Sequence, residues 1–176
     1  MQTEVEDKRL NNRREINMIW FIIAACGIVL DQLAKLWAYR NLAGGTVRQI
    51  IPDFLSFRYH VNTGAAWSFL ADHSWGIYLL SFISFLACIL FVVGIIRIQD
   101  RRIRFCLSLI LAGAAGNLID RILRRGVIDF VSFTFGSYHF PVFNLADMFL
   151  VIGLILVILF LLFTDSKSLL NSREKR

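Results

Sequence analysis

Four long apolar runs are the feature of this sequence that most constrains its fold. They cover about residues 18–38, 75–98, 103–123 and 144–163. Each is long enough to cross a hydrocarbon core about 30 Å thick, which takes about 20 helical residues. The second and fourth runs carry almost no charge between their ends, whereas a helix of a soluble bundle carries a charged face. The runs predict an all-α polytopic membrane protein with four transmembrane helices, forming one membrane domain over residues 18–164.

Lysine and arginine are distributed in a way that orients the four spans. They gather before the first span, in the short turn at 97–104 and after the fourth span. The two long connections, 39–74 and 124–143, carry few of them. Basic residues near span ends mark the cytoplasmic side of a membrane. We therefore expect both termini to be cytoplasmic and both long connections to lie outside, and the net charge of +6 needs no nucleic-acid partner.

The two ends of the chain and its cysteines are expected to take no part in chemistry. Residues 1–17 are polar and of mixed charge, which predicts a loose cytoplasmic extension, and residues 165–176 form a basic cytoplasmic tail. Cys26, Cys88 and Cys106 all fall within spans and have no metal-like spacing. We expect them to be small buried thiols.

The outer connections contain patterns typical of strands. Residues 55–61 alternate apolar and polar side chains, which is the period of a half-buried strand. Residues 127–143 are rich in β-branched and aromatic types, and Gly136 followed by Ser137 suits a two-residue hairpin turn. We predict a small β-sheet lying on the outer surface of the membrane. Residues 64–70 are apolar and predict a short interfacial helix beside it.

Charged side chains within the spans are few, and the predicted topology places all of them near the outer surface. A charge at mid-bilayer costs at least about 2.5–3.5 kcal/mol, so such groups are usually paired or functional. The residues concerned are Asp31, Lys35, Asp120, Arg121 and Asp147, with Asp129 just beyond the third span. Independent placements that agree on one depth indicate a site at the outer leaflet.

Two of these charged pairs differ in what they predict. Asp31 and Lys35 are four residues apart and share a helix face, so a structural ion pair and a part in chemistry are equally good interpretations. Asp120 and Arg121 are adjacent and point in different directions, so each should have its own partner. We favour Arg121 as a hydrogen-bond donor that orients a substrate.

Small and amide side chains near these charges have structural interpretations as well. Asn117 shares a face with Arg121, and an asparagine in a membrane helix can simply join helices together. Gly113 and Gly116 suggest close helix packing. Asn144 suits the N-cap of the fourth span, whereas we expect Asp147 to lie too deep to cap the helix.

The sequence lacks the patterns of several common catalytic sites. His60, His73 and His139 lie in outer connections without ligand spacing, and we expect them to be surface residues. No phosphate-binding loop, zinc helix or serine elbow is present, so we expect no cofactor and no metal. Carboxylates remain. Two facing aspartates cannot both ionise cheaply, so one stays protonated, and such a pair can activate a water and protonate a leaving amine.

Five stretches of the chain resemble the type II signal peptidases, the lipoprotein signal peptidases of bacteria. They are DQLAK at 31–35, NTGAAWS at 62–68, GAAGNLIDR at 113–121, GVIDF at 126–130 and FNLAD at 143–147. Each alone is weak, but all five in order within one four-span topology are highly specific. Ala112 and Trp67 stand where the family commonly has Gly and Phe, and residues 1–17 look like an extension.

The resemblance implies an aspartic endopeptidase of the bacterial inner membrane and assigns roles to its residues. It implies cleavage of a prolipoprotein signal peptide just before a diacylglyceryl-modified cysteine, at the periplasmic face. Asp129 and Asp147 would form the catalytic dyad. The residues expected around the substrate are Asn62, Asn117, Arg121 and Asn144, and those expected in support are Asp31, Lys35, Asp120 and Gly64. Membrane lipids are expected partners and a monomer the expected state.

A proton-coupled transporter or channel subunit is the strongest rival interpretation, because buried charges also mark ion paths. A carrier needs polar groups at the midplane or along a full path. The cytoplasmic halves of the spans lack such groups. A purely structural scaffold is a weaker rival, since it gives Asp147 no purpose.

Overall fold

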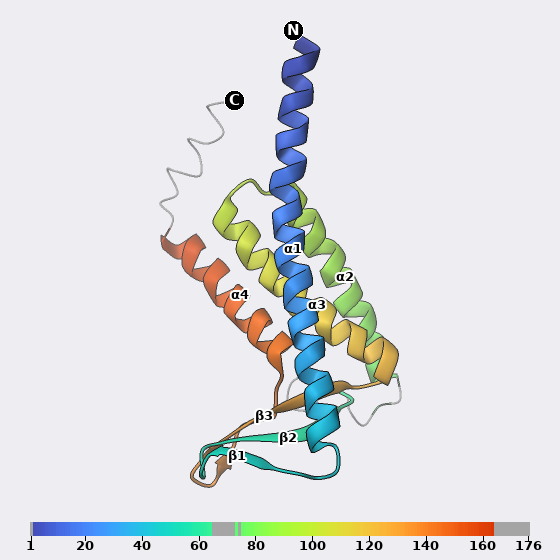
Figure 1. Cartoon of the computed structure of the whole chain (residues 1–176), viewed down its shortest axis with the longest axis vertical. Coiled ribbons are helices and arrows are strands. Elements are labelled where there is room, and N and C mark those ends of the chain that lie inside the picture. The colour runs from blue at the N-terminus through green and yellow to red at the C-terminus, as the bar shows by residue number, and fades with distance from the viewer. Residues whose placement is uncertain (1, 65–72, 74, 164–176) are drawn as a thin grey trace.

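Four long helices form the frame of the molecule (Figure 1). The computed structural model describes residues 2–64, 73 and 75–163, and for residues 2–17 the backbone alone. The helices are α1 (Gln2–Leu42), α2 (Gly76–Arg97), α3 (Arg101–Arg124) and α4 (Leu145–Phe163). All four are long and apolar enough to cross a membrane, α1 over its segment Met18–Leu42. The predicted four-span architecture is therefore confirmed, with boundaries shifted by a few residues.

Helix α3 is the central helix of the bundle. In its apolar segment 56% of the residues are buried, against 22% or fewer in the other three spans. Small residues let the neighbouring helices approach it closely. A Cβ atom added to Gly113 would collide with the Ala146 carbonyl and the Leu150 side chain on α4, and one added to Gly116 would lie 2.6 Å from Asp31 Oδ2 on α1. The close packing predicted at these glycines is confirmed.

A four-stranded antiparallel sheet lies at one end of the bundle, opposite the turn between α2 and α3 (Figure 1). Its order is β1 (Arg48–Ile51), β2 (Leu55–Asn62), β3 (Val127–Phe135) and β4 (Tyr138–His139). The predicted hairpin is present, with Gly136 at φ 60° in the two-residue turn, a conformation that favours glycine. Strand β1 was not predicted, because four residues are too few for a periodic pattern.

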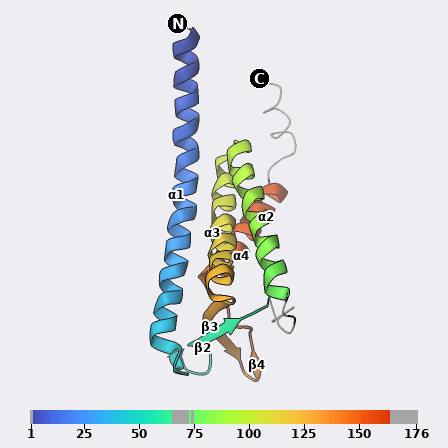
Figure 2. The ribbon, with the colours of Figure 1, turned by 90° about the vertical axis from the view of Figure 1, so that its right-hand side faces the viewer.

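Three expectations differ from the structure or lie outside it. Helix α1 runs back to Gln2, so the expected loose extension is helical, because residues 2–17 hold no Gly or Pro and continue a helix that the span has already nucleated (Figure 2). Cys106 is buried, Cys88 is half-buried and Cys26 is exposed on the outward side of α1, so burial was wrongly predicted for Cys26. The expected helix at 64–70, beyond Gly64, and the tail at 165–176 lie outside the described residues.

Candidate active site

Asp129 is aimed by the alternation of strand β3. Its neighbours Ile128 and Phe130 pack in a buried apolar cluster with Ala38 and Leu42 of α1. Successive side chains of a strand point to opposite faces, so Asp129 points away from this cluster. It lines a cavity instead, and only 2% of its surface is exposed.

Asp147 belongs to the first turn of α4, and this turn is capped by a reciprocal pair. Asn144 precedes the helix, and its side-chain oxygen accepts the backbone N–H of Asp147 at 2.9 Å. Oδ2 of Asp147 accepts the backbone N–H of Asn144 at 3.1 Å. This is the geometry of a capping box, in which two unpaired helix donors are satisfied at once. The cap predicted at Asn144 is present. The expectation that Asp147 lies too deep to cap was wrong, because α4 begins only two residues before it.

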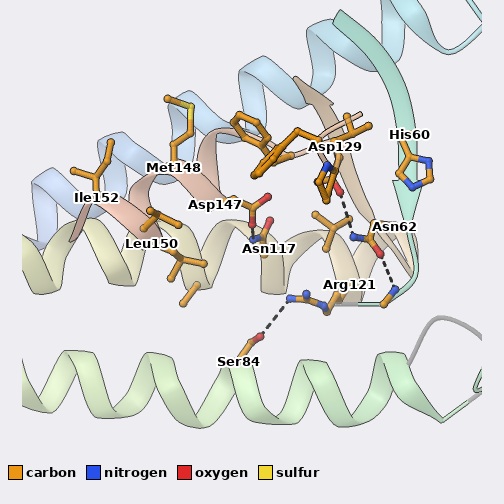
Figure 3. Close-up of a pocket in the computed structure, with 18 of the residues that line it drawn as sticks. His60, Asn62, Ser84, Asn117, Arg121, Asp129, Asp147, Met148, Leu150 and Ile152 are labelled. Atoms are coloured by element: carbon orange, nitrogen blue, oxygen red, sulfur yellow. Dashed lines mark hydrogen bonds between the residues drawn. The ribbon is translucent and has the colours of Figure 1, made fainter. Parts of the chain in front are cut away.

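Three asparagine amides hold the two carboxylates, and two of them, Asn62 and Asn117, are labelled in Figure 3. Asn144 donates from Nδ2 to Asp129 Oδ1 at 2.6 Å, and Asn62 donates to the other oxygen of Asp129 at 3.3 Å. Asn117 donates to Asp147 Oδ1 at 2.8 Å. Asn144 therefore contacts both aspartates, through its side chain and its backbone, and the two carboxylates share one donor network.

Gly64 completes this network at its outer edge. Its backbone N–H donates to Asn62 Oδ1 at 2.9 Å, which turns the amide nitrogen of Asn62 toward Asp129. Gly64 is itself buried. The sequence placed both residues near the carboxylates, and the structure brings them together with the other predicted site residues.

The environment of Asp129 favours its protonated form. Burial is the largest cause and the nearby charge of Asp147 the second, and together they raise the pKa of Asp129 from 3.8 to about 7. The amides of Asn144 and Asn62 and the charge of Lys35 act in the opposite direction. Such a carboxyl keeps a proton near neutral pH, as general acid catalysis by one member of a carboxyl pair requires.

A second charged group, the ion cluster, lies beside the two aspartates and is buried. The ion cluster consists of Asp31, Lys35, Asp120 and Arg124. Lys35 Nζ lies 2.8 Å from Asp31 and 3.2 Å from Asp120, and all three side chains are 0% exposed. Arg124 pairs with Asp120 from the edge of the cluster. Gln32 adds donors to Asp120 and to the Gly116 carbonyl.

Each aspartate of the ion cluster also holds the segment that carries one of the site aspartates. Asp31 Oδ1 accepts the backbone N–H of Ala146 at 2.9 Å, directly before Asp147. Asp120 Oδ2 accepts the backbone N–H of Ile128 at 3.0 Å, directly before Asp129. The cluster thus joins α1 and α3 to the start of α4 and to β3.

Arg121 points away from the ion cluster and lines the cavity, so the prediction that it and Asp120 have different partners is confirmed. Its guanidinium donates to Ser84 Oγ of α2 at 3.3 Å (Figure 3). Within the described part of the chain its buried Nε has no hydrogen-bond partner. Arg121 therefore retains donor capacity facing the cavity.

A large cavity of about 1290 Å³ joins these side chains. Its walls come from α2, with Ile83 and Phe91, and from α4, with Val151 and Ile152, while α3 contributes its floor. The apolar segments of α2 and α4 are 6% and 11% buried, so both helices face lipid over most of their surface. The cavity is consequently a cleft between two lipid-facing helices, with Asp129 and Asp147 at its polar end.

The rim of the cleft includes two of the three histidines. His60 and His139 are both exposed, as predicted, and both line the cavity. His73 is exposed on the approach to α2. Among the described residues, no three His, Cys, Asp or Glu side chains gather in a way that could hold a metal ion.

Three residues that contact the site or the ion cluster from their edges were not predicted from the sequence. Arg124 lies four residues after Asp120, and this helical spacing was a usable signal. Gln32 lies within the first matched stretch and could have been inferred from it. Ser84 gave no signal, since one serine in an apolar span has many possible roles.

Known proteins share both the sequence and the architecture. A model of the family described as signal peptidase (SPase) II matches residues 23–163. A lipoprotein signal peptidase of Listeria welshimeri is 37% identical over 86% of this chain and 97% of its own length. That of Clostridium tetani is 40% identical over 82% of this chain and 92% of its own.

Two solved structures, each described as a bacterial membrane enzyme, are 33% and 34% identical to this chain with TM-scores of 0.73 and 0.74. They cover 85% and 84% of it and 90% and 94% of their own chains. Four spans, a sheet at one end of the bundle, two aspartates joined by shared amide donors and the family match thus define a polytopic membrane peptidase. The chain belongs to the signal peptidase II family.

Proposed function

We propose that this protein is an aspartic endopeptidase that removes signal peptides from prolipoproteins carrying a diacylglyceryl-modified cysteine, and that it cuts before that cysteine. The observation that carries the proposal is the pair Asp129 and Asp147, which share the donor Asn144 at the polar end of an apolar cleft. The names of the curated relatives support the substrate class.

The proposed mechanism uses one protonated and one ionised carboxyl. The ionised member takes a proton from a water molecule, whose oxygen attacks the scissile carbonyl carbon while the protonated member donates to the carbonyl oxygen. The tetrahedral intermediate then collapses: one of its two hydroxyls returns a proton to the carboxyl that had donated one, the C–N bond breaks, and the nitrogen takes the proton that the base received. The pair ends with one proton, as it began.

The other predicted residues have supporting places in this scheme. Arg121 and Asn62 line the cleft and carry N–H donors, and we assign them to the backbone carbonyls of the substrate. Asn117 and Asn144 orient the dyad. Asn117 also lines the cleft, and we assign it to the edge of a bound peptide, whereas Asn144 is fully buried and does not line the cleft. The apolar walls fit the acyl chains and the hydrophobic part of the signal peptide.

The proposed setting is the bacterial inner membrane, with both termini in the cytoplasm and the active site at the periplasmic face. The basic turn between α2 and α3 lies at the end of the bundle opposite the sheet (Figure 1), which fits this orientation. One chain supplies the complete dyad and its amides, so we assign activity to the monomer. Membrane lipids surround the spans, and the proposal needs no nucleic acid, metal or cofactor.

The test is cleavage of a synthetic prolipoprotein peptide by the purified protein in detergent. We expect one cut before the diacylglyceryl-cysteine, at an unchanged rate in EDTA. The matched control is the same peptide with an unmodified cysteine, which lacks the acyl chains for the cleft and should be cut at least about 10²-fold more slowly. No cleavage of the lipidated peptide by folded protein refutes the proposed substrate. Loss of cleavage in EDTA refutes the metal-independent mechanism.

A further inference from the structure

Lys35 contacts the donor network of the dyad at one atom. Its ammonium lies 3.0 Å from Asn117 Oδ1, in addition to its two carboxylate partners. It is fully buried and does not line the cleft. Apart from the effect of its charge, Lys35 therefore makes contact with the dyad only through another side chain.

The contact fixes which way the amide of Asn117 faces. An ammonium group only donates hydrogen bonds, so the Asn117 atom beside it must be the oxygen. The same oxygen also accepts from Asn144 Nδ2 at 3.1 Å. The NH₂ group of Asn117 is consequently turned toward Asp147, to whose Oδ1 it donates at 2.8 Å. A flipped amide would place an NH₂ group against the ammonium and an oxygen against the carboxylate.

We propose that Lys35 is a positioning residue of the dyad, which holds Asp147 in place by fixing the amide of Asn117. Asp147 then keeps an oxygen that accepts from Asn117 on one side and an oxygen that accepts from the Asn144 backbone on the other. Asp129 is linked to Lys35 less directly, through the bond of Asn144 to Asn117 Oδ1, and its two amides are also oriented by backbone N–H groups of Gly64 and Asp147. Through Asn117, Lys35 therefore acts mainly on Asp147.

This role separates Lys35 from a merely structural ion. Removing its charge alone would leave Asp31 and Asp120 buried with only Arg124 to balance them, and the protein would be expected to unfold for that reason. The test therefore uses the double variant Lys35→Met with Asp31→Asn, which leaves Asp120 balanced by Arg124. The asparagine oxygen can still accept the Ala146 N–H that Asp31 accepts.

The inference rests on the proposed peptidase activity for its kinetic test. In the double variant we expect kcat to fall about 10²-fold, as for a misplaced catalytic group, and KM to stay within about threefold, since Lys35 does not line the cleft. The matched control is Arg124→Gln, which removes the other cation of Asp120 without touching Asn117 and should keep kcat within about threefold. An unchanged kcat in the folded double variant overturns the inference and leaves the proposed function standing.

A second measurement tests the route through Asn117. In an Asn117→Ala background the double substitution should lower kcat no further, because the link is already cut. An equal additional loss in that background overturns the route.

The side-chain amide of Asn117, followed by NMR on ¹⁵N-labelled protein, gives a readout that needs no activity. We expect its protons to exchange with water at least about tenfold faster in the double variant, since they lose the fixed bond to Asp147. Unchanged exchange overturns the inference even if the lipidated peptide is never cut.

Discussion

Two groups of charged side chains lie side by side in this molecule and differ in how their charges are balanced. The ion cluster sets two carboxylates, Asp31 and Asp120, against two cations within 3.2 Å or less, and its core is fully excluded from solvent. The dyad sets Asp129 and Asp147 beside each other with neutral amides as donors, and faces a cleft. Opposite charges in contact stabilise each other, whereas a nearby like charge raises the pKa of a carboxyl, as Asp147 does for Asp129.

The difference shows how one small region can serve two ends. The ion cluster has a structural role, because each of its aspartates also accepts a backbone N–H that fixes the segment before Asp129 or Asp147. Among the side chains that the structure describes, neutral amides and no cation contact the carboxylates of the proposed dyad. The pKa of Asp129 therefore stays at about 7, where a carboxyl can both hold and release a proton. Substitutions should therefore separate stability from rate according to which group they touch.

The largest expected effect is on rate, in the dyad. Asp129→Asn and Asp147→Asn should each lower kcat about 10³–10⁴-fold, the scale of a lost general acid or base. Asparagine at 147 can still accept the Asn144 N–H, so α4 keeps its cap. The melting temperature should not fall, because removing one of two like charges relieves repulsion. Peptide cleavage and thermal unfolding check this. Normal turnover by either folded variant would contradict the assignment of catalysis to these two aspartates.

The next effect is on stability, in the ion cluster. Asp31→Asn should lower the unfolding free energy by about 3 kcal/mol, because it leaves Lys35 short of one buried partner. Its rate loss should be no larger in free-energy terms. The control is Asp100→Asn, at a partly exposed pair with Arg102, where we expect less than about 1 kcal/mol. Denaturant unfolding measures both free energies. Equal losses would show that the buried ion pairs stabilise the fold no more than the partly exposed pair does.

A smaller effect should follow pH through Asp129. Its pKa of about 7 means that kcat/KM falls up to tenfold per pH unit above neutrality, as the proton is lost. The folded state holds this proton more tightly than the unfolded chain does, so the contribution of Asp129 to the unfolding free energy is complete below a pH of about 4. It declines toward pH 7 by at most about 1.4 kcal/mol per unit. Asp129→Asn should flatten the decline, and an identical pH profile in that variant would assign the titration elsewhere.

The smallest effect should come from packing that joins the two groups. Gly113→Ala should cost about 1–2 kcal/mol and reduce kcat, because the new Cβ would meet Leu150 and the Ala146 carbonyl at the start of α4. Gly44→Ala is the control, since nothing lies within 4 Å of its added Cβ and its stability should change by less than about 0.5 kcal/mol. Equal melting temperatures for the two variants would contradict the close approach of α3 and α4.

The sequence predicted the parts of the fold that depend on bulk patterns. Span lengths follow from the hydrocarbon thickness, so four helices were predictable. The sheet was predictable where alternation ran over seven residues, in β2, and at the Gly136 turn. Strand β1 was not, since its four residues pair by register with Phe57 and its neighbours and carry no pattern of their own. The helical state of residues 2–17 was missed because composition predicts burial better than it predicts helix continuation.

The sequence identified which residues form the site but not which side chains contact one another. The cost of a charge within a membrane is enough to mark Asp31, Lys35, Asp120 and Asp147 from their positions in the spans. Their partners depend on side chains brought from other helices, such as Ser84 of α2 beside Arg121. The second function of Asp147, in the cap of α4, depended on where the helix begins, which spacing alone leaves uncertain by a residue or two.

The cleft between α2 and α4 has a consequence for how the rate should depend on concentration. Its walls belong to two helices that face lipid, so a substrate held in the bilayer reaches it by sideways diffusion within the membrane plane. The rate at which enzyme and substrate meet then depends on the number of substrate molecules per lipid. Adding inert lipid or detergent at fixed total substrate should therefore slow turnover, because it dilutes the substrate within the membrane plane. Under the proposed function, the released signal peptide would leave by the same sideways route and would compete with new substrate for the cleft until it had diffused away.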